Sequence, residues 1–202
     1  DYPVRVLRED PKREGLLFAG TEFGMFISFD DGNSWQSFQQ NLPVTPITDI
    51  KIHRNDIVLS TMGRSFWIMD NIDYLRNFSF NDNEVLYPIT NTIRYRNRPS
   101  NSNHVSYPRT YVDIDYKITK ESVEDILIMI MDNENNLINS YKSIDKNQNI
   151  ENYEMSSNEF TFISNSNISN MIGVNRFKWD MRHRGSWNKN SRFSYRNGPM
   201  AK

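Results

Sequence analysis

Two acidic residues, Glu22 and Asp30, are the first candidates for chemistry in this chain. Glycoside hydrolysis uses a pair of carboxyl groups, one as acid and one as base or nucleophile. Glu22 adjoins Phe23, whose ring could stack on a sugar. Arg64, in a later turn, could hold a carboxylate through two parallel hydrogen bonds. We therefore take Glu22, Phe23 and Arg64 as candidate ligand contacts; the alternative for each is an ordinary loop residue.

Asp30 lies within the sequence Ser28-Phe29-Asp30-Asp31-Gly32-Asn33-Ser34-Trp35. Ser28 and Asp30 are short polar residues that bind backbone N–H groups in turns. Gly32 permits the positive φ of a tight reversal, and the ring of Trp35 can fold back over the turn. We expect Ser28, Asp30, Gly32 and Trp35 to be a structural staple of a β-hairpin. This pattern predicts a buried Trp35 and no catalytic role for Asp30.

The chain repeats itself at an interval of 40 residues. The paired positions are Phe18 and Val58, Thr21 and Thr61, Phe26 and Phe66, Ile27 and Trp67, and Asp30 and Asp70. A period of about 40–45 residues is typical of a four-stranded propeller blade.

The turn residues between the apolar runs predict four strands in each repeat. Those of the first repeat are Val4–Leu7, Leu16–Thr21, Met25–Phe29 and Ser34–Phe38. Those of the second are Ile47–Ile52, Ile57–Thr61 and Phe66–Asp70, with a weak fourth around Tyr74–Arg76. The second repeat does not retain the hairpin motif, and Leu75 takes the place of Trp35.

Neighbouring strands that run in opposite directions place alternate turns at opposite ends of a repeat. The turn between the second and third strands shares its end with the connection between the repeats. Glu22 and Phe23, Asn41 to Pro46, and Met62 to Arg64 are therefore expected at one end. The Ser28–Trp35 hairpin is expected at the other.

The amino-acid composition changes after the second repeat. Residues 78–108 are rich in Asn, Pro and Arg and predict a linker. From residue 109 the strand period returns, with Val112, Ile114, Tyr116 and Ile118 on one face. Further strands are expected at Ile126–Met131 (buried on both faces), Leu137–Tyr141, Glu159–Ile163 and 173–182, the last with Val174, Phe177 and Trp179 in the core. Residues 109–202 suit a partial immunoglobulin-like β-sandwich.

Composition narrows the classes of function. The 202 residues include 24 basic and 25 acidic residues and no Cys, so we expect neither a nucleic-acid partner nor thiolate chemistry. The longest apolar run, Ile126 to Met131, is far short of the roughly 20 residues of a membrane span. His53, His104 and His183 lack the spacing of metal ligands, and no cofactor motif is present, so we expect no metal and no cofactor. Because the chain starts with Asp1 inside a strand pattern, we expect it to be a piece of a longer protein.

With these motifs in place, the chain resembles a known family. The stretch from Val4 through the Ser28–Trp35 hairpin resembles bacterial BNR-repeat, or Asp-box, proteins with a sortilin-like β-propeller, which are often labelled glycosyl-hydrolase-like. Residues 60–70 resemble the blade that closes such a propeller, and residues 173–182 resemble a strand of the module that follows. Met62-Gly63-Arg64-Ser65 departs from the His-Gly-Arg-Gly of the family, so a role for that His is ruled out.

The resemblance implies an all-β fold: the last two blades of an Asp-box β-propeller in residues 1–77, a linker in 78–108 and a partial immunoglobulin-like β-sandwich in 109–202. It implies an extracytoplasmic protein (secreted, periplasmic or at the cell surface) whose propeller recognises a protein or a glycan without catalysis. One alternative is a sialidase- or xyloglucanase-like glycoside hydrolase whose catalytic carboxylates lie on blades absent from this sequence. Another is a scaffold for secretion or surface assembly. Fold alone does not choose among them.

Overall fold

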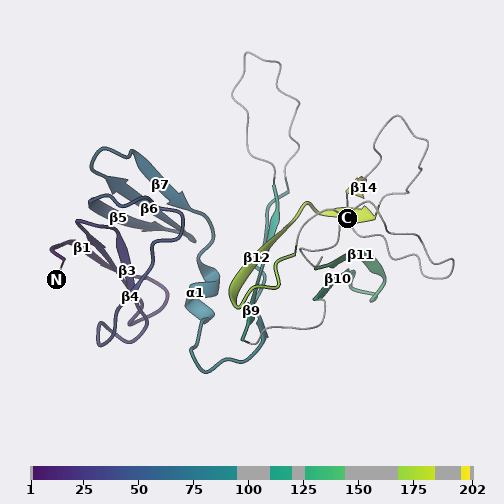
Figure 1. Ribbon diagram of the computed structural model, residues 1–202. Coiled ribbons are helices and arrows are strands. Elements are labelled where there is room, and N and C mark those ends of the chain that lie inside the picture. The colour runs from purple at the N-terminus through teal and green to yellow at the C-terminus, as the bar shows by residue number, and fades with distance from the viewer. Residues whose placement is uncertain (1, 95–109, 120–125, 144–167, 185–196, 201–202) are drawn as a thin grey trace, which may run out of the picture. The chain divides into compact units, whose positions relative to one another are not determined.

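The computed structural model describes residues 2–94, 110–119, 126–143, 168–184 and 197–200. The chain forms two compact units, Asp1–Phe80 and Asn81–Lys202 (Figure 1). Most of the regular structure is β-strand, and one short helix, α1 (Asp73–Asn77), occurs in the described part of the chain. The prediction of an all-β protein is therefore confirmed.

The first unit begins with a four-stranded antiparallel meander. Its strands are β1 (Val4–Glu9), β2 (Leu17–Thr21), β3 (Met25–Ser28) and β4 (Gln36–Ser37), hydrogen-bonded in that order. These are the four strands predicted for the first repeat, within one or two residues at most ends. In β3 the buried Met25 and Ile27 flank the less buried Phe26, as expected of a sheet with two different faces, whereas β2 is buried from Phe18 to Thr21.

The second sheet of this unit has three strands. They are β5 (Ile47–His53), β6 (Asp56–Thr61) and β7 (Phe66–Met69). The weak fourth strand predicted around Tyr74–Arg76 is wrong, because α1 occupies these residues. Tyr74 and Leu75 are both buried although they are adjacent. A strand would point them to opposite faces, whereas a helical turn directs both inward.

The two sheets share an irregularity that marks them as copies of one unit. In the first sheet the pairing between β1 and β2 shifts between Val4 and Val6. In the second sheet the pairing between β5 and β6 shifts between Ile47 and Asp49, in the corresponding place. An extra residue at the same point of β1 and β5 is a β-bulge, which bends and twists each strand.

The turns after β2 and β6 are also built alike. The hydroxyl of Thr21 donates to the carbonyl of Gly24 at 3.0 Å, and that of Thr61 donates to the carbonyl of Ser65 at 2.8 Å. The two threonines hold the same place 40 residues apart, as predicted. The second turn, however, is one residue longer than the first.

The longer turn changes the alignment of β3 with β7. The uniform interval of 40 residues predicts that Phe26 is equivalent to Phe66 and Ile27 to Trp67. Both equivalences are wrong by one residue. Gly20 pairs with Met25 in the first sheet, while Ser60 pairs with Phe66 in the second. The residues that correspond are therefore Met25 and Phe66, Phe26 and Trp67, and Ile27 and Ile68.

The two sheets pack against each other through β5, which contacts both β1 and β2. The buried side chains are Val6, Phe18, Met25 and Ile27 from the first sheet and Ile47, Ile50, Ile57 and Leu59 from the second. Gly20 lies at the closest approach. A Cβ atom at this position would lie 2.7 Å from Cγ1 of Val6 and 2.7 Å from Cγ2 of Ile47. The packing of the sheets therefore requires a glycine here.

The described residues of the second unit form three small sheets. The strands β8 (Val85–Leu86), β9 (Val112–Ile118) and β12 (Gly173–Trp179) form one of them. The hairpin of β10 (Leu127–Met131) and β11 (Leu137–Lys142) forms another, and β13 (Arg182–Arg184) pairs with β14 (Asn197–Met200). Six residues form the apolar core: Ile114, Tyr116, Ile118, Tyr141, Ile168 and Phe177.

Several expectations for this unit need correction. The predicted linker 78–108 contributes β8 to the sheet, and residues 95–109 lie outside the described residues. Strand β10 was expected to be buried on both faces, but Leu127, Met129 and Met131 are exposed and only the alternate residues face the core. The predicted strand Glu159–Ile163 also lies outside the described residues.

Strand β12 places its side chains by simple alternation. Phe177 is buried and Trp179 packs on the core, as predicted, whereas Val174 is exposed. Val174 has the opposite parity and so belongs to the other face of the strand. The prediction that all three contribute to the core is wrong for Val174.

Replacing Gly20 with Ala tests the close approach of the two sheets. We expect Gly20→Ala to lower the free energy of unfolding by about 1–3 kcal/mol, because the added methyl group overlaps two branched side chains. The matched control is Ser60→Ala, at the same place in the second sheet, which loses an exposed hydrogen bond to the hydroxyl of Thr48 and should change the free energy of unfolding by no more than about 1 kcal/mol. Urea unfolding followed by circular dichroism measures both. Equal stability of the two variants would contradict this account of the packing.

Candidate functional site

Three chain segments meet at one end of the first unit. Met62 donates its backbone N–H to the carbonyl of Pro46, and the Thr45 hydroxyl donates to the carbonyl of Met62. The side chain of Gln39 accepts from the N–H of Met25 at 3.2 Å and so ties the connection between the sheets to the turn after β2. We call residues 22–24, 39–46 and 62–65 the loop end. Their grouping agrees with the prediction from strand direction.

Glu22 does not stand free at the loop end. Its Oε1 accepts a hydrogen bond from Nε of Arg5 at 2.7 Å within an ion pair, and its backbone N–H donates to the carbonyl of Pro3. A general acid of a glycosidase needs an apolar environment that favours its protonated form. Glu22 is instead partly exposed and paired with a guanidinium. The geometry therefore favours a structural or ligand-binding role for Glu22 over an acid.

Phe23 contributes to an exposed aromatic pair. Its ring centroid lies 4.9 Å from that of Tyr2, with the two planes tilted by 56°. Both rings are about half exposed. The hydroxyl of Thr21 accepts the N–H of Phe23 and fixes the turn that carries the ring. The sequence indicated Phe23 but not its partner Tyr2.

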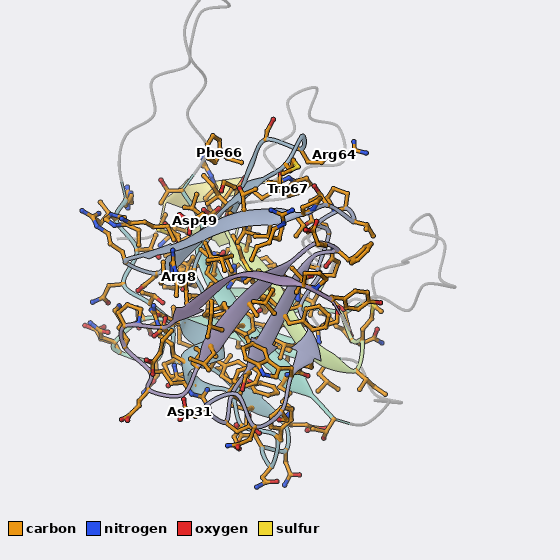
Figure 2. All side chains as sticks on the ribbon, turned by 90° about the vertical axis from the view of Figure 1, so that its left-hand side faces the viewer. Arg8, Asp31, Asp49, Arg64, Phe66 and Trp67 are labelled. Atoms are coloured by element: carbon orange, nitrogen blue, oxygen red, sulfur yellow. The ribbon has the colours of Figure 1, made fainter. Side chains whose placement is uncertain are left out.

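Arg64 is held by its backbone and presents its side chain to solvent. The backbone N–H donates to the hydroxyl of Thr61 at 3.1 Å, and the backbone carbonyl accepts from Nε1 of Trp67 at 2.9 Å. Figure 2 shows the side chain extending outward from the turn between β6 and β7. Within the described part of the chain, its guanidinium makes no hydrogen bond or ion pair, nor does Arg64 contact Glu22 or Phe23.

The Ser28–Trp35 hairpin lies at the other end of β3. The buried hydroxyl of Ser28 donates to Oδ1 of Asp30 at 2.8 Å and accepts the N–H of Gly32 at 2.9 Å. Asp30 also accepts the N–H and the hydroxyl of Ser34, at 2.8 and 2.5 Å. Gly32 has a φ of +83°. The bonds from Ser34 and Ser28 lower the pKa of Asp30, and an acceptor of this kind is not a proton donor at neutral pH.

Trp35 closes the hairpin but is not buried as predicted. Its indole Nε1 donates to the carbonyl of Gly32 at 3.0 Å, so the ring folds back over the turn. The side chain nevertheless remains 40% exposed. The strand after the turn, β4, has only two residues, both exposed, and lies at the edge of the sheet.

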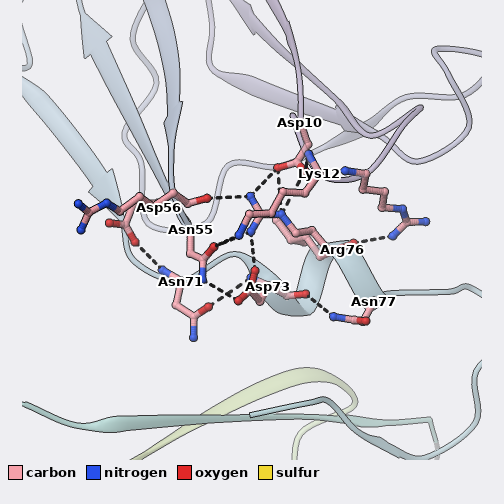
Figure 3. A network of polar contacts seen from close by, with 11 residues as sticks. Asp10, Lys12, Asn55, Asp56, Asn71, Asp73, Arg76 and Asn77 are labelled. Atoms are coloured by element: carbon pink, nitrogen blue, oxygen red, sulfur yellow. Dashed lines mark hydrogen bonds and ion pairs between the residues drawn. The ribbon is translucent and has the colours of Figure 1, made fainter. Parts of the chain in front are cut away.

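A buried network between distant segments was missed by sequence reasoning. Arg76 from α1 binds Asp10, which follows β1, at 2.8 Å, and the two side chains are 8% and 0% exposed. Arg76 also binds the side chain of Asp73, the side chain of Asn55 and the carbonyl of Arg54 (Figure 3). We call this network the clasp. It joins the first sheet, the turn between β5 and β6, and the helix.

The clasp is fully satisfied. Burial by itself would raise the pKa of Asp10, but the hydrogen bonds from Arg76 and from the backbone N–H groups of Lys12 and Arg13 outweigh it and lower that pKa. Asp10 and Arg76 are 66 residues apart. In the sequence Asp10-Pro11 indicates only a turn, and nothing local points to Arg76 as its partner.

Other classes of site find little support. Among the residues that the structure describes, no three His, Asp or Glu side chains are grouped to hold a metal ion. Of the three histidines, His104 lies outside that set. No described helix has the length and apolar character to cross a membrane.

Comparison with known proteins identifies no relative. No family model matches the chain, and neither a curated protein nor a solved structure is significantly similar to it. The candidate site therefore has to be judged on its own geometry.

Asp30→Asn tests the hairpin staple. The variant keeps the size of the side chain but loses charge-assisted acceptors, so we expect a lower melting temperature at pH 7. Since the pKa of Asp30 is lowered in the folded chain, its stabilisation is present above the unfolded pKa of about 3.9 and is lost as the pH falls through the folded pKa. The difference in melting temperature between Asp30→Asn and the wild type should therefore become smaller as the pH is lowered. Asp31→Asn, at an exposed neighbour with φ of +56° that Asn tolerates, is the control and should change little.

Arg76→Met tests the clasp. Removing one partner of a buried ion pair leaves the Asp10 carboxylate unpaired, and we expect the free energy of unfolding to fall by about 3–5 kcal/mol. Arg5→Met breaks the more exposed pair with Glu22 and should cost no more than about 1 kcal/mol. Urea unfolding at pH 7 measures both. Similar losses in the two variants would contradict a special role for the buried pair.

Proposed function

We propose that the first unit is part of an Asp-box β-propeller and that it recognises an extracytoplasmic ligand, a protein or a glycan, without catalysing a reaction. In this proposal the second unit is immunoglobulin-like and serves as a spacer or docking module. The observation that carries the proposal is the contrast between the two ends of the unit. The loop end presents an aromatic pair and an unpaired guanidinium. At the opposite end, the polar side chains bind one another in the hairpin staple and the clasp.

The chemistry of the loop end favours an acidic glycan among these ligands. The exposed ring of Phe23, backed by Tyr2, offers an apolar surface of the kind that stacks on a sugar ring. The guanidinium of Arg64 can bind a carboxylate in a bidentate manner. Stacked sheets lie about 10 Å apart, so a ligand that touches both turns has to span about that distance.

The carboxylates of the first unit supply the argument against catalysis. Asp10 and Glu22 are ion-paired, and Asp30 is an acceptor of several hydrogen bonds with a lowered pKa. None of these three resembles the pair of carboxyl groups, one with a raised pKa, on which a glycosidase depends. The hydrolase alternative therefore requires carboxylates other than these three.

Binding to immobilised sialylated oligosaccharides, with neutral xyloglucan as a second probe, tests the proposal. We expect binding of the sialylated probe to weaken about tenfold in Phe23→Ala and in Arg64→Ala, the loss of one good contact each, with unchanged melting temperatures. Lys51→Ala removes the same charge from an exposed strand position outside the loop end and should bind like wild type.

Two results would count against this function. Wild-type binding that survives both substitutions would remove the loop end as the ligand site. Release of reducing sugar from either probe would favour the hydrolase, whether or not Glu22→Gln abolishes it. Binding of xyloglucan in preference to the sialylated probe would refute the acidic glycan and keep the stacking role of Phe23.

A further inference from the structure

A second guanidinium, that of Arg5, lies against the loop end beside the exposed ring of Phe23. The segment before and including Arg5 runs along the turn after β2. Tyr2 packs its ring on that of Phe23. The carbonyl of Pro3 accepts the backbone N–H of Glu22, and the guanidinium of Arg5 binds the side chain of Glu22. Arg5 is therefore anchored to the residue that directly precedes the stacking ring.

The β-bulge of β1 accounts for the direction of this side chain. The pairing of β1 with β2 skips Arg5, because its two neighbours pair with consecutive residues of β2, Thr21 and Gly20. The extra residue of a bulge departs from the strict alternation of a strand, and bulges beside binding sites redirect a side chain in this way. Here the bulged residue reaches Oε1 of Glu22 from Nε at 2.7 Å.

The equivalent bulge of the second sheet shows that the fold does not require an arginine at this place. Its extra residue is Thr48, since Ile47 and Asp49 pair with consecutive residues of β6. The hydroxyl of Thr48 lies 2.7 Å from that of Ser60 on the neighbouring strand. A short neutral side chain is sufficient for the bulge, so the charge of Arg5 calls for an explanation other than the fold.

Only part of the Arg5 guanidinium is used within the unit. Nε and Nη2 both approach a single oxygen, Oε1 of Glu22. Within the described part of the chain, Arg5 makes no other hydrogen bond or ion pair. An arginine side chain has further N–H donors in the same planar fork. Because the side chain is 37% exposed, these donors are available to a ligand.

An aromatic ring beside a guanidinium fits a single acidic sugar residue. The sugar ring stacks on Phe23, and its carboxylate accepts hydrogen bonds from the open donors of Arg5. Arg64 belongs to the second sheet, and stacked sheets lie about 10 Å apart, so it contacts a different part of an extended ligand. Arg5 is thus the guanidinium placed to recognise the sugar that stacks on Phe23.

Glu22 has two opposing effects on this contact. Its oxygen holds the guanidinium of Arg5 in place. Its negative charge repels the carboxylate of an acidic sugar and partly neutralises Arg5. A glutamine at this position retains the oxygen acceptor but removes the charge, which separates the two effects.

We propose that Arg5 binds the carboxylate of the sugar residue stacked on Phe23 and so determines the preference for an acidic over a neutral sugar. In this arrangement Glu22 is a positioning residue that limits the affinity. The inference rests on the class of ligand proposed for the loop end. It adds the residue that recognises the charge of the stacked sugar.

An NMR titration of the full chain with methyl β-D-glucuronide tests this inference. Methyl β-D-glucoside, which has the same ring but no carboxylate, is the neutral probe. In the wild type, the glucuronide should shift the signals of the Phe23 amide and of Arg5 Nε–H and should bind more tightly than the glucoside. We expect Arg5→Met to weaken glucuronide binding about tenfold, and Glu22→Gln to strengthen it about fivefold by removing the repulsion. Neither substitution should change the affinity for the glucoside.

A second exposed ion pair provides matched controls. Arg8, also on β1, binds Asp49 at 2.7 Å outside the loop end. Arg8→Met and Asp49→Asn remove the same charges as the two test substitutions and should leave the affinity for both sugars unchanged. Arg5→Gln replaces Arg5→Met if the methionine variant does not give the dispersed spectrum of a folded chain.

The use of single sugars separates this inference from the proposed function, which is judged with an oligosaccharide that spans both turns. Equal affinities of the wild type for glucuronide and glucoside would overturn the inference, as would failure of both the wild type and Glu22→Gln to bind the glucuronide. Equal losses in Arg5→Met and Arg8→Met would also overturn it, because net charge would then explain the binding. Discrimination between the two sugars without binding of the sialylated oligosaccharide would support Arg5 and refute a ligand site that spans both turns.

Discussion

The close approach of two β-sheets at Gly20 governs the first unit of this protein. A side chain at this position would occupy the space of Val6 and Ile47, so only a glycine lets the apolar faces meet. This contact determines which face of each sheet is buried and which is left open. It also aligns the sheets so that corresponding turns lie at the same end.

The two ends of the unit are built from different kinds of interaction. At one end, buried or mutually bonded polar groups hold the Ser28–Trp35 hairpin and the clasp around Arg76. At the other end, backbone bonds of Thr21 and Thr61 shape the turns, and side chains such as Phe23 and Arg64 remain exposed. A rigid end thus supports an end whose side chains are available to a ligand. Binding sites are commonly loops positioned by a rigid scaffold.

The repeat explains both the stability of the unit and its open surfaces. Burial of the Met25 and Ile27 face removes apolar area from water once, inside the unit. The corresponding residues of the second sheet, Phe66 and Ile68, remain exposed. Repetition of a sheet always leaves one unmatched face at each side unless the series closes or meets another sheet.

The amino-acid sequence by itself determined the features that depend on near neighbours. The turn residues between the apolar runs defined the strands of the first sheet. The spacing of Ser28, Asp30 and Gly32 defined the hairpin, because its hydrogen bonds span no more than four residues. The shared place of Thr21 and Thr61 followed from the repeat. Each of these is a local pattern that a sequence displays directly.

The tertiary structure decided what depends on distant partners. The helix at Asp73–Asn77 replaced an expected strand because Tyr74 and Leu75 are both buried and Arg76 finds Asp10, 66 residues away. The exposure of Trp35 and the open face of Phe66 depend on what else packs nearby. Burial is a property of the assembled sheets, and an ion pair over this distance forms only after the chain has folded. No periodicity in the sequence can therefore reveal either one.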